Sequence, residues 1–477
     1  MTHPPNAPAV PAARSTAPAR PAGVPAQPSP APGGPPAPGR GALAVGRERL
    51  RAVATSEPGR LQILGAVLAL LLVAFGAVTA LQVDDRAGAV DDVVHRSRPL
   101  SADAASIYRY LADADTTAAS GFLAGTLEPK ESREQYDRDI AGAARLLVEA
   151  SAGGSGSGES AEQIAVLNEQ LPRYTGLIER ARAANRQGLP LGGAYLRYAN
   201  QQMTTILLPA AERLYEAETE RLRQDDSSAR AWPWASVALG LAVLAVLAWA
   251  QRRNYLHTHR VFNQGLLAAT AATVAALLWL VAAHSLARAD LSEARTRGQE
   301  SLQALNTARI GSLTARANEN LTLVARGAVL TEDPDPAKRK DKYETDYTAS
   351  MDTLTRALAT AGERADDSEG RTPVQEAVAR VGEWQQRHKD ARARDEAGDY
   401  EAALTRIIGP EDSTEQAFDQ VDAALEKALA HEGNEFTRAA SAAGGALALL
   451  PFGAALLGVL GAAGAVLGVN RRLSEYR

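Results

Sequence analysis

Four long, uncharged apolar stretches interrupt an otherwise polar chain. They are Leu61–Val83, Trp232–Ala250, Val261–Leu286 (crossing the membrane over residues 264–286) and Ala439–Val469. Each is close to or above the roughly 20 residues that a helix needs to cross a bilayer, and a helix satisfies its own backbone polar groups. The fourth stretch is long, and Pro451 predicts a kink or a tilt within it. The pattern therefore predicts an all-α integral membrane protein with four transmembrane helices.

Three clusters of basic residues flank these stretches, and in a four-span topology all three fall on the same side of the membrane. They are Arg47, Arg49, Arg51 and Arg60 before the first stretch, Arg252, Arg253 and Arg260 between the second and third, and Arg471, Arg472 and Arg477 after the fourth. Cationic flanks of short loops stay in the cytoplasm. We therefore expect a multi-pass protein of the plasma membrane with both termini inside. Residues 84–231 and 287–438 would then lie outside, whereas a basic link at 251–263 and a tail at 470–477 would lie inside.

The two outer segments read as copies of each other. Four features recur in the same order: Arg133–Asp139 as Lys340–Asp346, Ala181–Ala183 with Gly188 as Ala391–Ala393 with Gly398, Ile206–Pro209 as Ile407–Pro410, and the loop region Ser151–Ser160 as Ala361–Gly370. One such match can arise by chance. Four in one order favour a duplicated unit of span, outer domain and span.

Apolar residues recur at steps of three and four within both outer segments, which is the period of an amphipathic helix. Each such set forms one face of a helix, here called a seam. The seams are Ile107, Leu111, Ala114, Ala118 and Phe122; then Leu167, Leu171, Tyr174, Ile178 and Ala181; and, in the second copy, Ala377, Val381, Trp384, His388 and Ala391. Each outer segment is therefore expected to form an extracytoplasmic four-helix bundle.

Signals that end helices divide each bundle. Gly188-Leu189-Pro190 and Gly398 are typical of helix stops, and Asp399 is suited to cap the next helix. The outer helices beginning at Asp84 and covering Glu212–Arg230 can run unbroken into the spans. A small shift in a bundle would then reach the cytoplasmic face mechanically.

The first 60 residues are rich in proline and alanine and have little to bury, so we expect a disordered cytoplasmic tail. A solvated tail and a docking site for a protein that reads polyproline conformation are both open. A signal peptide is the alternative for the first apolar stretch. Its length and the residues before it favour an uncleaved anchor.

Composition argues against several classes of function. The chain has no cysteine, which removes disulfides and thiolate chemistry, and its net charge of −5 points to no nucleic-acid partner. Neither a phosphate loop, a metal-ligand cluster nor a nucleophile motif occurs, so we expect no catalytic residue, no metal and no cofactor. The spans carry no Asp, Glu, Lys or Arg inside them, which argues against a transporter. An enzyme is not expected.

Several polar residues are candidate contacts for a ligand or partner: Tyr136, Asp139, Arg182, Tyr343, Asp346, His388 and Arg392. The Tyr–Asp pairs recur in both copies, and the arginines could hold a carboxylate between helices. His388 replaces Ile178 on the seam and could sense pH or a ligand. For each, structural pairing or a solvated helix face is the alternative. His284, near the outer end of the third span, is expected to be an interfacial anchor.

The inner face is small, so any output must pass to a separate cytoplasmic protein. Its candidate partner contacts are Arg252, Arg253, Arg260, Arg471, Arg472 and Tyr476. The basic residues could instead only set the topology and touch anionic membrane lipid. Gly464 and Gly468 form a Gly-x-x-x-Gly pair that favours close helix packing, either within the chain or in a homo-oligomer.

The stretches Ile107–Asp115 and Phe122–Gly125, together with Asn320–Gly327, resemble the outer four-helix-bundle sensors of chemoreceptors and sensor kinases. From residue 61 to the tail Arg472–Arg477, the chain resembles the four-span membrane components of the actinobacterial protein kinase G amino-acid-sensing pathway. The high use of alanine, arginine and glycine fits an actinobacterial source.

This resemblance implies a signalling adaptor that has no catalytic residues. Its partners would be an extracytoplasmic solute-binding lipoprotein for glutamate or aspartate and a soluble cytoplasmic Ser/Thr protein kinase that controls 2-oxoglutarate metabolism. Two alternatives remain open: a direct small-molecule receptor, and an envelope scaffold without a signalling role.

Overall fold

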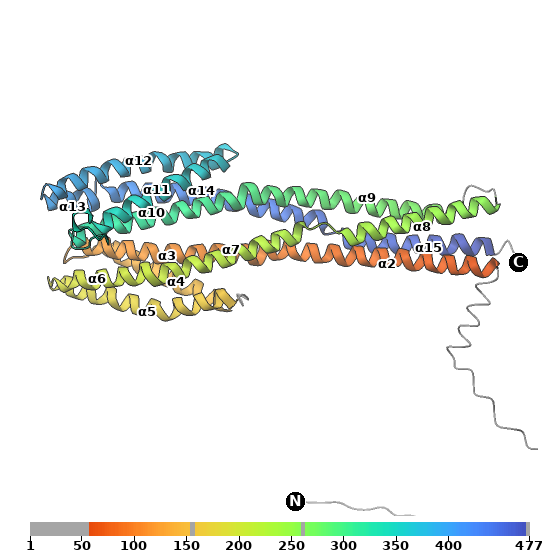
Figure 1. Ribbon diagram of the computed structural model, residues 1–477, viewed down its shortest axis with the longest axis horizontal. Helices are drawn as coiled ribbons and strands as arrows, with labels where there is room; N and C mark the ends of the chain where they lie inside the picture. The colour runs from red at the N-terminus through yellow and green to blue at the C-terminus, as the bar shows by residue number, and fades with distance from the viewer. Residues whose placement is uncertain (1–56, 153–157, 259–262, 474–477) are drawn as a thin grey trace, which may run out of the picture. The chain divides into compact units, whose positions relative to one another are not determined.

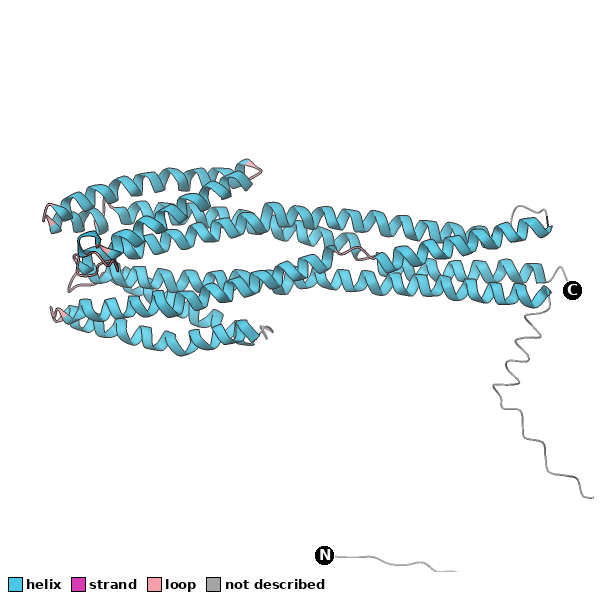
Figure 2. Cartoon of the chain, in the orientation of Figure 1, coloured by secondary structure: helices cyan, strands magenta, loops and turns pink. Residues whose placement is uncertain are grey.

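All regular elements of the described chain are helices (Figure 1, Figure 2). The computed structural model describes residues 57–152, 158–258 and 263–473. From Leu61 onward these helices form one compact unit. Four of the described helices are long and apolar enough to cross a membrane. The all-α membrane-protein class predicted from the sequence is therefore confirmed.

The helices follow the same order in two successive halves. The first half comprises α2 (Glu57–Asp92), the π-helix η1 (Val93–Ser97), α3 (Arg98–Leu123), α4 (Lys130–Ala152), α5 (Gly158–Arg186), α6 (Leu191–Gln202), the π-helix η2 (Met203–Leu207), α7 (Leu208–Arg230) and α8 (Trp234–Thr258). The second comprises α9 (Gln264–Glu293), the π-helix η3 (Ala294–Gln299), α10 (Glu300–Ala325), the short η4 (Pro336–Lys338), α11 (Lys342–Arg364), α12 (Ser368–Glu396), α13 (Tyr400–Ile408), α14 (Thr414–Leu447) and α15 (Leu450–Leu473).

Three pairs of matching helices in the two halves have equal lengths. The pairs α3/α10, α4/α11 and α5/α12 contain 26, 23 and 29 residues in each member. Asp399 caps α13, because its side chain accepts a hydrogen bond from the Ala402 amide. The order and lengths agree with an internal duplication.

The buried residues of α4 and α11 indicate a different correspondence between the two helices than their sequence similarity does. The buried residues Tyr136, Ala143 and Leu147 of α4 have the same spacing as Tyr347, Leu354 and Leu358 of α11. Tyr136 therefore corresponds to Tyr347, one helical turn beyond the Tyr343 expected from the sequence. The longer connection between α10 and α11 accounts for the shift.

The first bundle (α3 to α7) and the second bundle (α10 to α14) share one hydrophobic core, in which α3 and α10 pack against each other. The amide of Asn320 is fully buried there. It donates hydrogen bonds to the Ser120 hydroxyl at 2.7 Å and to the Thr116 carbonyl at 3.4 Å. The outer segments are therefore joined along their length. This shared core has no signal in the sequence periodicity.

The apolar helices pack through glycines. A side chain on Gly458 of α15 would lie 2.9 Å from the Gly76 Cα of α2. One on Gly265 of α9 would collide with the carbonyl of Gly464 and the backbone of Gly468. The Gly464/Gly468 pair therefore serves close packing within the chain, which is one of its two expected roles.

Two bundle helices continue into apolar helices without a break. The α2–η1–α3 and α9–η3–α10 runs are continuous (Figure 1), and a π-helix lies at the same point of each. π-Helical turns often mark functional positions in long helices. Helical continuity at these two junctions agrees with the expectation from the sequence.

The α7–α8 junction contradicts that expectation. The helix ends at Arg230, Ala231 is extended with ψ of 131°, and α8 begins only at Trp234. Pro233 has no N–H to continue a helix. The freed carbonyl groups are bound by neighbours: Arg288 donates to the Arg230 carbonyl at 2.7 Å and Arg86 to the Ala231 carbonyl at 3.1 Å.

His284 differs from expectation, whereas the helix break beside Pro451 agrees with the expected kink. His284 is 1% exposed and its ring centre lies 5.1 Å from that of Trp232, so it is buried between helices rather than facing the interface. The fourth apolar stretch is divided between α14 and α15, and Pro451 lies in the first turn of α15. Proline is well tolerated at that position.

Candidate functional site

Arg182 of α5 holds a carboxylate between helices, and that carboxylate belongs to the chain itself. Its guanidinium group lies 2.9 Å from Glu128 and 2.8 Å from Glu179. The same group covers the Tyr136 ring at 4.2 Å. This arrangement fixes the distal connection between α3 and α4 against α5.

Asp139 belongs to a buried carboxyl pair. It is 1% exposed and hydrogen bonded to Asp113. The Gln135 amide donates to Asp139 at 3.1 Å and to Asp113 at 3.3 Å. Burial and the negative charge of Asp113 raise the pKa of Asp139 to about 8, although the Gln135 amide and the Arg109 charge oppose the rise. The pair is therefore able to hold a proton near neutral pH.

His388 lies at the centre of a buried charge network in the second bundle. Its Nδ1 is 2.9 Å from Glu319 and its Nε2 is 3.2 Å from Glu344. Glu319 is also paired with Arg316 at 2.7 Å, and both of these side chains are essentially unexposed. Arg392 approaches Glu344 at 3.2 Å. The Tyr347 ring stacks on His388 with centres 3.7 Å apart.

The network keeps His388 charged. Burial alone would lower the pKa of its ring, but the hydrogen bonds to Glu319 and Glu344 and their charges raise it to about 9. Burial would likewise raise the pKa of Glu319, yet the His388 hydrogen bond and the Arg316 charge hold it below its ordinary value. The site therefore stores paired charge inside a helical bundle.

The first bundle has a simpler counterpart at the same place. Tyr174, which corresponds to Trp384, donates a hydrogen bond to Asp115 at 3.1 Å. Trp384 donates in the same way to Glu319 at 3.2 Å. Asn200 supplies a second hydrogen bond to Asp115 at 2.7 Å. Burial raises the pKa of Asp115 to about 6 against these two hydrogen bonds.

A cavity of about 680 Å³ lies between the two halves, bounded by α6, η2, α10 and α11. Its polar lining comprises Arg197, Tyr198, Asn200, Gln201, Thr204, Thr205, Thr314, Asn318, Lys342, Tyr343, Asp346 and Ser350. Asn200 connects the cavity wall to the buried Asp115. Cations, a carboxylate and amides together could bind a small polar molecule.

Two of the residues predicted from the sequence, Tyr343 and Asp346, line this cavity. Lys342 and Asp346 form an ion pair there. Tyr136, Asp139, Arg182, His388 and Arg392 do not line it. Sequence reasoning missed Arg197 and Asn200. An asparagine on the buried face of α6, beside Leu196 and Ala199, was the available signal for Asn200.

The predicted cytoplasmic contacts lie at the other ends of the apolar helices. Arg252 and Arg253 are in the last turns of α8, and Arg253 lies 5.5 Å from the centre of the Trp249 ring. Arg471 of α15 donates to the Gln264 side chain at 3.3 Å. Arg472 is in α15, but its side chain, Arg260 and Tyr476 lie outside the described residues.

One group of possible metal ligands was not expected. Asp367, Glu369 and His431 offer ligand atoms within 4.8 Å of one another. His431 is paired with Asp367 at 3.2 Å and with Glu435 at 3.7 Å. The cluster joins the α11–α12 connection to α14. Ion pairing within the protein accounts for it.

Comparison with known proteins identifies one part of the chain. Residues 89–227 match the family model of an actinobacterial sensor domain. The matched segment covers η1 and the whole first bundle up to the end region of α7. No curated protein and no solved structure matches the chain.

This match supports a sensor-type actinobacterial protein. Together with four helices suited to cross a membrane, it indicates a membrane protein with a sensing role. The sensor match ends before the second half begins, although that half repeats the helix order of the first.

Proposed function

We propose that the chain is a transmembrane signalling adaptor. It would relay extracytoplasmic glutamate or aspartate status from a solute-binding lipoprotein to a cytoplasmic Ser/Thr protein kinase. The observation that carries the proposal is the helical continuity of α2–η1–α3 and α9–η3–α10. Each connects a sensor-like bundle directly to an apolar helix. Helix shifts of about 1–2 Å at such junctions are a known form of signal transmission.

The shared core supports a concerted response. Because α3 and α10 pack together and Asn320 bonds across to Ser120 and Thr116, a change in one bundle must be accommodated by the other. Packed interiors switch between discrete arrangements rather than deforming gradually. A partner could bias the two arrangements only by as much as it prefers one of them.

The distal loops of the first bundle offer a docking surface for the binding protein. Leu127, Leu189 and Leu191 are 87%, 47% and 53% exposed on two connections. The Asn185 amide holds these connections together through the Phe122 carbonyl at 3.2 Å and the Gly125 carbonyl at 2.8 Å. Exposed leucines on adjoining rigid loops are suited to protein contact.

The opposite ends of the apolar helices would face the cytoplasm. Arg252, Arg253 and Arg471 lie there, which agrees with the positive-inside rule. We propose these ends as the kinase-contacting face, with Arg260, Arg472 and Tyr476 contributing from the adjoining segments. Anionic lipid would bind the same residues in the absence of the kinase.

Co-purification tests the adaptor. The full chain in lipid discs is incubated with the lipoprotein and the kinase, with and without glutamate. We expect lipoprotein capture by the native chain, loss of capture by Leu127→Glu with Leu189→Glu, and retention by the matched control Val148→Glu. Val148 is 65% exposed on α4, away from these loops. Absence of both partners under every condition would refute the adaptor.

A direct receptor is the second candidate, and the cavity between the halves favours it. Arg197 and Lys342 could bind an anionic group, while Asp346 could bind an amino group. Calorimetry with the full chain and glutamate, without any other protein, separates this candidate from the adaptor. Saturable binding that Arg197→Gln abolishes and the exposed Arg213→Gln preserves would favour the receptor.

A further inference from the structure

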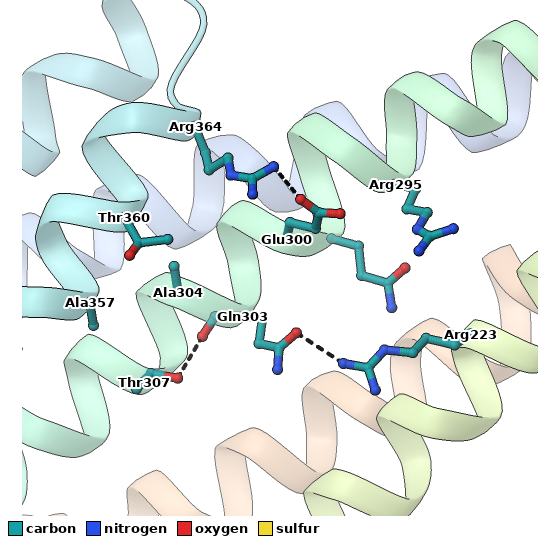
Figure 3. Close-up of a pocket in the computed structure, with 10 residues that line it drawn as sticks. Arg223, Arg295, Glu300, Gln303, Ala304, Thr307, Ala357, Thr360 and Arg364 are labelled. Atoms are coloured by element: carbon teal, nitrogen blue, oxygen red, sulfur yellow. Dashed lines mark hydrogen bonds and ion pairs between the residues drawn. The ribbon is translucent and has the colours of Figure 1, made fainter. Parts of the chain in front are cut away.

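A second cavity, of about 600 Å³, lies where the halves approach the apolar helices. Its lining comes from α7, η3, α10 and α11 and comprises Arg223, Arg295, Gln299, Glu300, Gln303, Ala304, Thr307, Ala357, Thr360 and Arg364. Figure 3 shows Arg364 reaching Glu300 and Arg223 reaching Gln303, while Arg295 lies on the same side of the lining. Neither the predicted contacts nor the docking loops are part of it.

Two of the arginines are held in place by groups on α10. Arg223 donates to the Gln303 side chain at 3.2 Å across the boundary between the halves, and Arg364 is paired with Glu300 (Figure 3). Arg223 is also 3.2 Å from Glu220 on its own helix. The Arg223 and Arg364 side chains are both exposed, at 47% and 45%, so an oxyanion can reach their guanidinium groups.

The charge of the lining is unbalanced. It contains three arginines against the single carboxylate of Glu300, which leaves two positive charges. Outside the lining, Glu220 is paired with Arg223 at 3.2 Å and Asp226 interacts with the charge of Arg295, so these two carboxylates on α7 offset part of the excess. Gln299, which is 8% exposed, and the hydroxyls of Thr307 and Thr360 add neutral hydrogen-bonding groups. Guanidinium groups bind carboxylate and phosphate oxygens in a paired geometry.

We propose that this cavity binds a small divalent oxyanion, either a free solute or the headgroup of an anionic lipid. The anion would be held by Arg223 from the first half and by Arg295 and Arg364 from the second. Arg364 would exchange part of its pairing with Glu300 for pairing with the anion. This site is independent of the docking proposed above.

Binding of an anion in this cavity would connect the two halves close to where their bundles join the apolar helices. Arg223 is on α7, which leads to the break before α8, whereas Arg295 is in η3, which continues from α9. An anion between them would hold α7 against the α9–η3–α10 helix. The response of the bundles would then depend on anion occupancy, in the manner of an allosteric effector.

Isothermal titration of the full chain in phosphatidylcholine discs tests the site, with succinate and inorganic phosphate as dianions and acetate as the monoanion. We expect the dianions to bind saturably and acetate to bind more weakly. Loss of one guanidinium contact should weaken the affinity for the dianions about tenfold. The variants are Arg223→Gln and Arg364→Gln. Matched controls are Arg213→Gln on α7 and Arg356→Gln on α11, both exposed and outside the cavity. Circular dichroism verifies folding of each variant.

A second arm distinguishes the source of the anion. Discs containing phosphatidic acid, whose phosphomonoester headgroup can carry two negative charges, should raise the melting temperature of the native chain and not that of Arg223→Gln if the ligand is a lipid headgroup. Saturable solute binding in phosphatidylcholine discs supports a free anion. Equal behaviour of native chain and both cavity variants in both arms would overturn the proposal. Docking of the lipoprotein at Leu127 and Leu189 is measured separately, so the two proposals can fail independently.

Discussion

The second half has the ionisable ring of His388 where the first half has Ile178. Charged side chains surround the histidine. Glu319, Glu344 and Arg316 surround the ring, and every charged member has a partner of opposite sign within 3.2 Å. Buried pairs contribute little stability over an apolar core, but removing one member leaves the other unpaired. The first half has no such charge pair at this place, because Asp115 accepts hydrogen bonds from the neutral side chains of Tyr174 and Asn200.

Replacing His388 by the isoleucine of the first half should destabilise the chain. His388→Ile removes a charged hydrogen-bond partner from Glu319 and Glu344, which keep Arg316 and Arg392, so the free energy of unfolding should fall by about 1.5–3 kcal/mol. Thermal unfolding followed by circular dichroism measures this. Lys389→Ala, at the exposed next position, is the control. An unchanged midpoint for His388→Ile would contradict the network as described.

Stability should also fall as pH rises from 6.5 to 9. The folded pKa of His388 is about 9, above its ordinary 6.5, so its contribution is complete below pH 6.5 and is lost toward pH 9. Asp139 acts in the same direction below pH 8, because its folded pKa of about 8 means that the folded state keeps a proton that the unfolded chain releases.

Denaturation midpoints measured across this range check the titration. His388→Ile should flatten the fall between pH 6.5 and 9, and Asp139→Asn should flatten the part below pH 8. A pH profile that neither variant alters would exclude these two groups as its source.

The helices connect the bundles to the apolar segments in two ways. Continuous helices with a π-turn occur at α2–η1–α3 and α9–η3–α10, whereas α7 and α8 are separated by an extended Ala231. The separated ends are held by side chains from other helices. Gln82 accepts from the Ser236 amide at 2.9 Å, and Arg86 and Arg288 donate to the freed carbonyls. The break is therefore a fixed joint.

Removing one of these clamps should loosen the joint locally. Arg288→Ala loses a charge-assisted hydrogen bond worth about 1.5–3 kcal/mol, so amide exchange around residues 231–236 should accelerate about tenfold or more. Hydrogen exchange with mass spectrometry measures it. Arg438→Ala, whose side chain is 71% exposed, should leave the exchange of this segment unchanged. Equal exchange in both variants would show that Arg288 does not hold the joint.

Close packing of α9 against α15 depends on a glycine. In Gly265→Ala the new methyl group would collide with Gly464 and Gly468, and overpacking should cost about 1–3 kcal/mol. Detergent-induced unfolding of the purified chain measures the loss. Gly445→Ala is the matched control, because nothing lies within 4 Å of a side chain at Gly445. Equal stability of the two variants would mean that the helices are not in close contact.

For the whole molecule, the features that the sequence predicted are those determined by residues close together along the chain. Long apolar runs indicated the four helices suited to a membrane, and the seam Leu167, Leu171 and Tyr174 is buried in α5 as expected. The Asp399 cap followed from local chemistry in the same way. These features depend on neighbours three or four residues away, which a single sequence displays.

Features that depend on contacts between distant segments were missed. Tyr136 was paired with Tyr343 because similar letters surround both, although burial aligns it with Tyr347. The shared α3–α10 core and the convergence of Arg223, Arg295 and Arg364 on one cavity arise only when the halves pack together. The break at residue 231 has a local signal in Pro233, which cannot donate a backbone hydrogen bond.

Signal relay requires both bundles to lie outside the cell and the basic ends of the apolar helices to lie inside. The chain has no cysteine, so single-cysteine variants report one position each. Suitable positions are Leu127 and Leu330, which are 87% and 48% exposed on the distal connections of the two halves, and Leu256, which is 60% exposed near the end of α8. We expect a membrane-impermeant maleimide to label Leu127→Cys and Leu330→Cys in intact cells, and Leu256→Cys only after lysis. Labelling of Leu256→Cys in intact cells, with either distal position protected until lysis, would contradict the account.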